Sequence, residues 1–322
     1  QAPKIFHDRI HKLAECLPNV IIPPFELEMD SAGHNQNEAH LRCMEQARDR
    51  RWEYAILMQN HDVILKTHAE ITEILKIYGG ANDIDLWPCP DHRCIDSLEM
   101  NLGKLELCSQ DMTGEELAKC SSANINWAKG SMQVVVSRAA VDFIFTRINV
   151  DHLVKQMNEM GYGVDEQLYA SLQITPEIGL PGGFHPKCLH LKPQSVTREA
   201  SWHPTYYGLG SAWNKFVRFA TNEAENDCPS GRLRHASCIY GVDDLPQLAE
   251  SKQIMANKML PDFDYAVVSC VSELLFNRTR DGSEIDRAHY ENINTVRYHR
   301  ERSQPGFDID QFECEKWHEI AQ

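Results

Sequence analysis

The chain has 322 residues, 42% of them hydrophobic and 25% charged, so it can bury a large core as one big domain or two. Its formal net charge of −15 argues against binding to the phosphate backbone of nucleic acids or to anionic membrane surfaces. Because no run of about 18 apolar residues occurs, the sequence predicts no membrane-spanning helix.

The first predicted elements alternate between strands and helices. Residues 18–24, an apolar stretch closed by prolines, predict a short strand, and residues 37–50 predict a helix. The continuous apolar run at 54–58 is typical of a buried parallel strand. Thr67 and Glu70 have the spacing of a capping box, which predicts a helix that ends at the following glycine pair.

The middle of the chain begins with an irregular stretch, residues 88–120, that holds four cysteines. Residues 132–136 predict a second buried strand, and Ser137 is a candidate cap for the helix after it. Asp151 is a candidate cap for the next helix. A further helix is predicted from Glu166 to about residue 173, before a proline stops it.

The last third is less regular. Residues 181–211 are rich in proline, glycine, histidine and aromatic residues and predict a loop. Residues 238–240 predict a short strand, and Asp243 or Asp244 would cap the helix that follows. Residues 263–276 predict an amphipathic helix, whereas residues 281–322 show no clear pattern.

The alternation of strands and helices predicts an α/β protein with a mostly parallel central sheet. The sequence shows no internal repeat, no low-complexity tract and no linker that would divide it. We therefore expect one domain over residues 1–322, in which the pattern of the tail, residues 281–322, predicts no particular secondary structure.

The residue pair Asp165-Glu166 places two carboxylates on the first turn of a predicted helix. A carboxylate within reach of a hydroxyl can take its proton in a transition state, so Glu166 is a candidate general base. The alternative is that both carboxylates cap the helix and favour its dipole.

Two cations flank a second candidate site. Arg234 follows Cys228 in a turn that ends near Cys238, and Lys258 comes just past the next predicted helix. Arginine can grip phosphate oxygens with two hydrogen bonds, and lysine acts as a point charge, so the pair could hold a diphosphate. The alternative is two solvated surface cations, the usual state of these residue types.

Together with residues 127–131 and 134–138, these segments resemble the core-2/I-branching β-1,6-N-acetylglucosaminyltransferases, glycosyltransferase family 14. The resemblance runs from about Cys16 to about Leu275, with the landmarks in the same order. It implies a single A-type, Rossmann-like glycosyltransferase domain that lacks its N-terminal strands. It also implies inverting, metal-independent transfer of N-acetylglucosamine from UDP-GlcNAc to a hydroxyl of an oligosaccharide acceptor, in β-1,6 branching.

The resemblance implies roles for single residues. Glu166 falls on the catalytic glutamate, and Arg234 and Lys258 fall on the residues that hold the donor diphosphate in place of a metal. Cys228 and Cys238 fall on a local disulfide, although they lie one residue farther apart than in the family. Counting back from Cys238 would put His235 in the arginine position; Arg234 is preferred because histidine is mostly neutral at pH 7.

The acceptor side follows from the same resemblance. Arg93 falls on an arginine near the acceptor sugar; the alternative is a surface loop arginine. Phe219 and Thr221 take the positions of an acceptor-binding tryptophan and tyrosine. Since aromatic faces stack on sugar rings, this difference predicts an acceptor other than the usual mucin core.

No metal or cofactor is expected. Three Asp-x-Asp tripeptides occur, but so acidic a chain produces them by chance, and none follows a clear strand end. A zinc site is the alternative, from two clusters of possible ligands. These clusters are Cys89, His92 and Cys94, and His185, Cys188 and His190.

Eleven cysteines favour an oxidising compartment over the cytosol. Cys16, Cys43 and Cys270 fall on family cysteines whose partners lie upstream of the region matched by Gln1. We expect a type II membrane protein of the Golgi lumen, with its membrane anchor upstream. Asn277, in the one Asn-x-Ser/Thr sequon, is a candidate glycosylation site.

Two other activities stay open. One is a related transfer of xylose or glucuronic acid, which would use a different UDP-sugar donor. The other is a non-catalytic, disulfide-rich module that binds glycans, favoured by the missing N-terminal region and by the changed acceptor aromatics. In each reading the partners are glycans and no nucleic acid.

Overall fold

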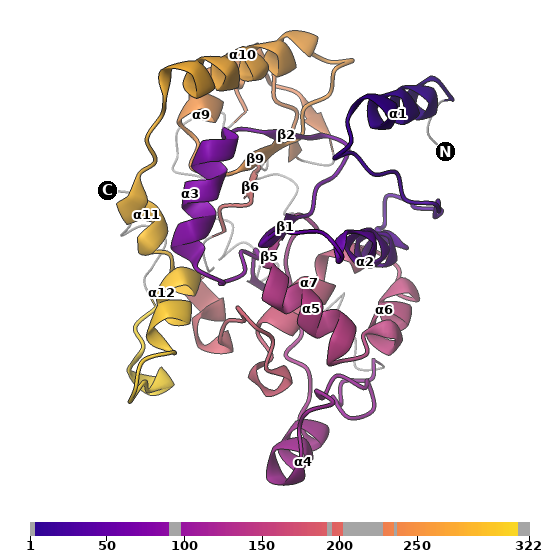
Figure 1. The fold of residues 1–322 in the computed structure, drawn as a ribbon, viewed down its shortest axis with the longest axis vertical. Helices are drawn as coiled ribbons and strands as arrows, with labels where there is room; N and C mark the ends of the chain where they lie inside the picture. Colours follow the sequence, from indigo (N-terminus) through magenta and orange to yellow (C-terminus); the bar gives the residue numbers. More distant parts are fainter. Residues whose placement is uncertain (1–3, 90–97, 192–194, 202–227, 235–236, 315–322) are drawn as a thin grey trace.

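The computed structural model describes residues 4–89, 98–191, 195–201, 228–234 and 237–314 (Figure 1). These residues form a mixed α/β structure in which helices surround four small sheets. Cys89 is the last described residue before a gap that contains Arg93, His92 and Cys94. Phe219, Thr221 and His235 also lie outside the described residues.

The sheets differ from the expected parallel sheet. Within the described ranges, one strand pair is parallel, β6 with β9, and the other pairs are antiparallel. The two apolar runs expected to be parallel strands, β1 and β5, pair antiparallel with each other. An apolar run indicates that both faces of a strand are buried, but it does not indicate whether the strand pairs parallel or antiparallel with its neighbour. The expectation of a mostly parallel sheet is therefore wrong for this part of the chain.

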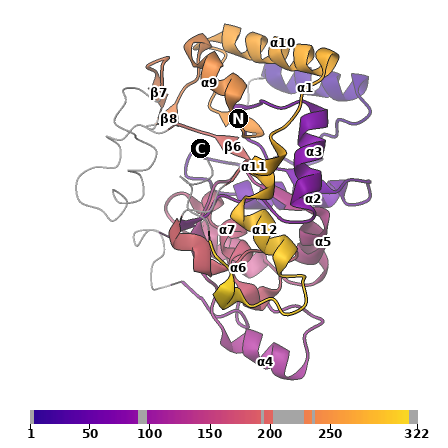
Figure 2. The ribbon, with the colours of Figure 1, turned by 90° about the vertical axis from the view of Figure 1, so that its left-hand side faces the viewer.

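The strands group as follows: β1 (Tyr54–Ile56) with β5 (Val135–Ser137); β2 (Asp62–Ile64), β9 (Met255–Asn257) and β6 (Arg198–Glu199); β3 (Trp87–Pro88) with β4 (Ala128–Lys129); and β7 (Leu233–Arg234) with β8 (Ser237–Cys238). Figure 2 shows β7 and β8 on the side of the molecule away from α2 and α5.

The helices have these bounds: α1 (Lys4–Cys16), α2 (Gln36–Ala47), α3 (His68–Tyr78), α4 (Gly114–Ser122), α5 (Arg138–Thr146), α6 (Asp151–Asn158), α7 (Leu168–Gln173), α9 (Leu245–Glu250), α10 (Tyr265–Asp281), α11 (Arg287–Glu291) and α12 (Asn294–Glu301). Short 3-10 turns are η1 (Val164–Glu166), η2 (Pro176–Ile178), η3 (Pro186–Leu191), η5 (Val242–Asp244) and η6 (Ile309–Gln311). None of the helices in the described ranges combines the length and the apolar character needed to span a membrane.

Two predicted caps are confirmed. Thr67 Oγ1 accepts from the Glu70 amide at 3.2 Å, and Glu70 Oε2 accepts from the Thr67 amide at 2.6 Å, which completes the capping box of α3. That helix ends at Gly79, whose φ of 56° suits glycine. At α5, Ser137 Oγ accepts from the Ala140 amide at 3.2 Å.

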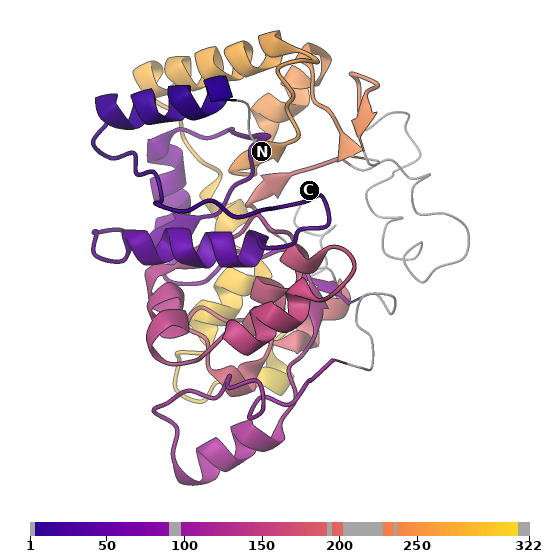
Figure 3. The same ribbon diagram turned by 90° about the vertical axis from the view of Figure 1, so that its right-hand side faces the viewer.

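Other predicted elements differ. Residues 18–24 form no strand, and the preceding helix α1 has no buried residue, so its sequence carries little core pattern. Figure 3 shows α1 at the same end of the molecule as α10. Asp151, expected to cap a helix, is the first residue of α6. Its amide donates a hydrogen bond to Asn149 Oδ1 at 3.0 Å. Helix α4 begins within the stretch expected to be irregular and ends two residues beyond it; a disulfide joins Cys108 to Cys120 on this helix.

The C-terminal segment, expected as an unread tail, packs on the body. It descends from α10 along α3 to α12 (Figure 1). Tyr290, Ile293 and Val296 share a buried cluster with Ile74 and Tyr78 of α3. The pattern was hard to read because α11 has only five residues and α12 eight, too few for a clear helical period.

The end of this segment is attached at η3. Lys187 Nζ donates to the carbonyl oxygens of Ile309, Asp310 and Phe312, each at 2.8 Å. Beside it, Cys188 forms a disulfide with Cys314, which closes a separation of 126 residues. Cys188 is therefore not available as a zinc ligand, so the alternative zinc site at His185, Cys188 and His190 loses its cysteine.

Candidate active site

Glu166 ends the 3-10 turn η1, directly before α7. Its backbone carbonyl accepts from the Gly130 amide at 2.6 Å, and its Oε2 lies 3.3 Å from Lys129 Nζ. The Glu166 side chain is 23% exposed and that of Lys129 is 17% exposed. The site thus holds a carboxylate that water can still reach, with an ammonium group beside it.

The neighbouring carboxylate faces elsewhere. Asp165 packs against Gly33, where a Cβ atom would come within 2.2 Å of Asp165 Oδ1. Gly33 has a φ of 91°, which also favours glycine there. Asp165 therefore lies against Gly33, whereas Glu166 lies beside Lys129.

Strand β4 is joined to the Glu166 segment by side-chain contacts as well. Trp127 Nε1 donates to Gln167 Oε1 at 2.7 Å, and the Ala128 amide donates to Ser171 Oγ at 3.1 Å. At Gly130 a Cβ atom would lie 2.4 Å from the Asp85 carbonyl oxygen, so the close approach requires glycine. These contacts hold residues 127–131 against residues 165–170.

The two predicted cations lie near one another and near Glu166. Burial lowers the pKa of Lys258, the Arg234 and Arg198 charges lower it further, and Asp62 and Glu166 oppose the shift. Arg234 and Lys258 also contribute to the lowered pKa of His61, after burial. The structure therefore brings Glu166, Arg234 and Lys258 together from η1, β7 and the end of β9.

Arg198, on β6, was not recognised from the sequence. Its Nη1 donates to Gln133 Oε1 at 3.1 Å, and Gln133 Nε2 donates to Asp62 Oδ1 at 3.0 Å. Asp62 also accepts from Asn257 Nδ2 at 2.7 Å, directly before Lys258. Burial raises the pKa of Asp62, and these hydrogen bonds oppose the rise. The chain of contacts links Arg198 on β6 to Asn257 on β9, the residue directly before Lys258.

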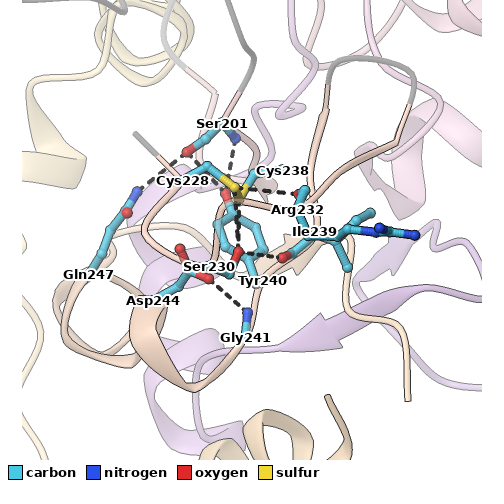
Figure 4. The surroundings of a disulfide bond; sticks show 10 residues. All are labelled: Ser201, Cys228, Ser230, Arg232, Cys238, Ile239, Tyr240, Gly241, Asp244 and Gln247. Atoms are coloured by element: carbon cyan, nitrogen blue, oxygen red, sulfur yellow. Dashed lines mark hydrogen bonds between the residues drawn. A yellow bond between two sulfur atoms is a disulfide. The ribbon is translucent and has the colours of Figure 1, made fainter. Parts of the chain in front are cut away.

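Arg234 lies on the β7–β8 hairpin, which a disulfide closes (Figure 4). Cys228 and Cys238 form this bond, the pairing that the resemblance implied. Ser230 Oγ donates to the Ile239 carbonyl oxygen at 2.7 Å and ties the turn to the strand. Arg234 pairs with Ser237 between β7 and β8, and its side chain is exposed.

The acidic tripeptides are engaged in the fold. Asp83 is buried and accepts from Tyr78 Oη at 2.6 Å and Thr197 Oγ1 at 2.6 Å. Asp264 caps α10 and Asp308 caps η6. Over the described ranges, the one cluster of three possible metal ligands is Cys228, Cys238 and Asp244, and its two cysteines are joined to each other. Cys89 is also disulfide-bonded.

A separate surface groove of about 770 Å³ lies between α2, the end of α5 and α6. Its apolar lining includes Leu41, Ile144 and Val154, and acidic residues such as Glu38 and Asp151 border it. None of the residues that line this groove belongs to the site around Glu166.

Comparison with known proteins shows what the chain is similar to. A family model described as Core-2/I-Branching enzyme matches residues 1–248. The chain is 24% identical over 291 residues to "Beta-1,3-galactosyl-O-glycosyl-glycoprotein beta-1,6-N-acetylglucosaminyltransferase 3" of Rattus norvegicus, and 25% identical over 292 residues to the human protein of that name. The Bovine herpesvirus 4 protein, named as a transferase of the same kind, is 26% identical over 293 residues. Each match covers 88% of this chain and 62% of the relative.

Proposed function

The chain belongs to the Core-2/I-branching enzyme family, and we propose that it is the catalytic part of a glycosyltransferase that carries out β-1,6 branching. The chain spans about 62% of the length of the relatives it matches, so the proposal concerns the whole protein. The donor would be UDP-GlcNAc, and the acceptor a hydroxyl of an oligosaccharide, within a single A-type domain. The observation that carries the proposal is that Lys258 lies close enough to both Arg234 and Glu166 for their charges to shift its pKa.

Glu166 supplies the base in this proposal. A sugar hydroxyl is a poor nucleophile until its proton is taken, and a carboxylate in hydrogen-bond reach removes it in the transition state. The acceptor oxygen then bonds to the anomeric carbon as the bond to UDP breaks. A single displacement inverts that centre and needs no covalent intermediate.

Arg234 and Lys258 stabilise the leaving group. Negative charge grows on UDP as the glycosidic bond breaks, and fixed cations placed there lower the barrier without reorganisation. The lowered pKa of Lys258 supports a site built of cations, because burial and the Arg234 and Arg198 charges cause it. A bound diphosphate would relieve this repulsion.

Metal independence is part of the proposal. The cations supply positive charge where other enzymes use a metal, and Asp83, Asp264 and Asp308 each have hydrogen bonds within the fold. We expect activity to persist in EDTA. Activity that vanishes with EDTA and returns with manganese would contradict this part.

The proposed setting is the Golgi lumen, as a type II membrane protein whose anchor lies upstream of Gln1. The disulfides at Cys108, Cys188 and Cys228 support an oxidising compartment. Asn277, partly buried on α10, stays a predicted glycosylation site, and Arg93 a predicted acceptor contact. Localisation of the tagged full-length protein by microscopy, with and without glycosidase treatment, tests this setting.

Transfer assays test the function. The full-length protein is incubated with radiolabelled UDP-GlcNAc and a panel of oligosaccharide acceptors that includes galactosyl-N-acetylgalactosamine and glycans other than the mucin core, and the product linkage is read by NMR. A β-1,6-linked product supports the proposal. Transfer only from UDP-xylose or UDP-glucuronic acid favours the related activities, and glycan binding without transfer from any donor favours the non-catalytic module.

A further inference from the structure

The ion pair between Lys129 and Glu166 has no part in the mechanism above. Its atoms are 3.3 Å apart, and both side chains are largely shielded from water, where attraction between charges is screened less than at the surface. We propose that Lys129 is a positioning residue that fixes the Glu166 carboxylate in the orientation needed to receive the acceptor proton. This inference rests on the proposed function.

The backbone places both residues before their side chains meet. Gly130 donates its amide to the Glu166 carbonyl oxygen at 2.6 Å, one residue after Lys129. Across the sheet, Lys129 pairs with Trp87, whose Nε1 donates to Asp85 Oδ2 at 2.9 Å. These contacts fix the main chain on both sides, so the ion pair settles the remaining freedom, the side-chain rotamer of Glu166.

The arrangement also tolerates the charge change of the reaction. When the acceptor O–H bond breaks, its proton goes to Glu166, and the hydroxyl oxygen bonds to the anomeric carbon. The electrons of the broken glycosidic bond leave with UDP. Glu166 is then neutral, and Lys129 keeps a partner, because its Nζ also lies 3.3 Å from the Gly130 carbonyl oxygen. Lys258 is a second cation whose charge interacts with that of Glu166.

The test compares Lys129→Met, which keeps length and loses charge, with Lys129→Arg, which keeps charge. We expect kcat of the Lys129→Met enzyme to fall about 10- to 100-fold, as for a misplaced catalytic group, with donor KM and UDP affinity unchanged. Lys129→Arg should retain most of the turnover, and added methylammonium should restore part of it to Lys129→Ala, which leaves space for the amine. The control is Lys104→Met, in the exposed pair of Lys104 with Glu99.

Two kinetic results would overturn the inference: wild-type kcat in Lys129→Met, or a loss of UDP affinity that matches the loss of kcat, which would make Lys129 a donor-binding cation. A double-mutant cycle in thermal unfolding, combining Lys129→Met with Glu166→Gln, gives a readout that needs no activity. If the wild-type protein transfers no sugar, the proposed function fails. In that case shifts in Tm that simply add overturn the positioning contact, and non-additive shifts support it.

Discussion

At the scale of single residues, the structure makes Glu166 the first residue to change. We expect Glu166→Gln to lower the turnover of the full-length enzyme by about 10²- to 10⁴-fold, because the amide cannot take a proton. UDP binding should survive, since Arg234 and Lys258 stay in place. Steady-state kinetics and calorimetry measure the two effects. Asp165→Asn is the matched control, since Asp165 packs against Gly33; equal losses in both variants would contradict the assignment.

The cations make a separate prediction. Hydrogen bonds to charged groups are worth about 1.5–3 kcal/mol, so Arg234→Ala and Lys258→Ala should each weaken UDP binding by about tenfold or more. Lys252→Ala is a matched control, because Lys252 forms an exposed pair with Asp286 at 3.3 Å. Calorimetric titration with UDP measures these affinities. Unchanged affinity in both cation variants would reject the assignment of Arg234 and Lys258 to the donor site. A large loss only in His235→Ala would move the arginine position by one residue.

His40, on α2, should make stability depend on pH. Burial lowers its pKa to about 4, against 6.5 for an ordinary histidine. Below pH 6.5 the unfolded chain binds a proton that the folded chain refuses, so stability is intact above pH 6.5 and falls as the pH approaches 4. The full loss is about 3 kcal/mol. Urea unfolding at pH 7 and pH 4.5 measures it, and His40→Gln should show a smaller fall; an identical fall would exclude His40.

At the scale of elements, the contact between β4 and η1 is the most sensitive. Gly130→Ala should destabilise the protein by about 1–3 kcal/mol, because the new Cβ would meet the Asp85 carbonyl oxygen and Ala170. Turnover should fall too, since the Gly130 amide donates to the Glu166 carbonyl oxygen and a shift of Gly130 would disturb that contact. Gly114→Ala is the control, where nothing lies within 4 Å, although its φ of 54° carries its own strain. Equal losses in thermal unfolding would contradict the packing argument.

Elements defined by local contacts could be predicted from the sequence, and those defined by distant ones could not. The capping box at Thr67 and the cap at Ser137 depend on residues three positions away, which the sequence displays. The direction of β1 depends on its partner β5, eighty residues later, and no local pattern encodes that choice. Arg198 had no signal in the sequence, because its place in the site arises from its hydrogen bond to Gln133 and from its charge near Lys258, both distant in the chain.

At the scale of the whole molecule, the disulfide between Cys188 and Cys314 fastens the C-terminal segment. Removing it by Cys188→Ala with Cys314→Ala should lower the free energy of unfolding by about 2–5 kcal/mol, mainly because the unfolded chain gains freedom. The matched control removes Cys108 and Cys120, which close only 12 residues against 126, so its loss should be about 2 kcal/mol smaller. Denaturant unfolding compares the two, and a larger loss in the control would contradict the loop-closure argument.

The attachment of the C-terminal segment also affects how the protein behaves after a single cut by a protease. A cut between α10 and α11 separates the chain into two pieces, yet Cys188 lies in one and Cys314 in the other. The nicked protein would therefore migrate as an intact chain on a non-reducing gel and split only after reduction. Lys187 would still hold the three carbonyl groups, so the smaller piece would stay docked without a continuous backbone.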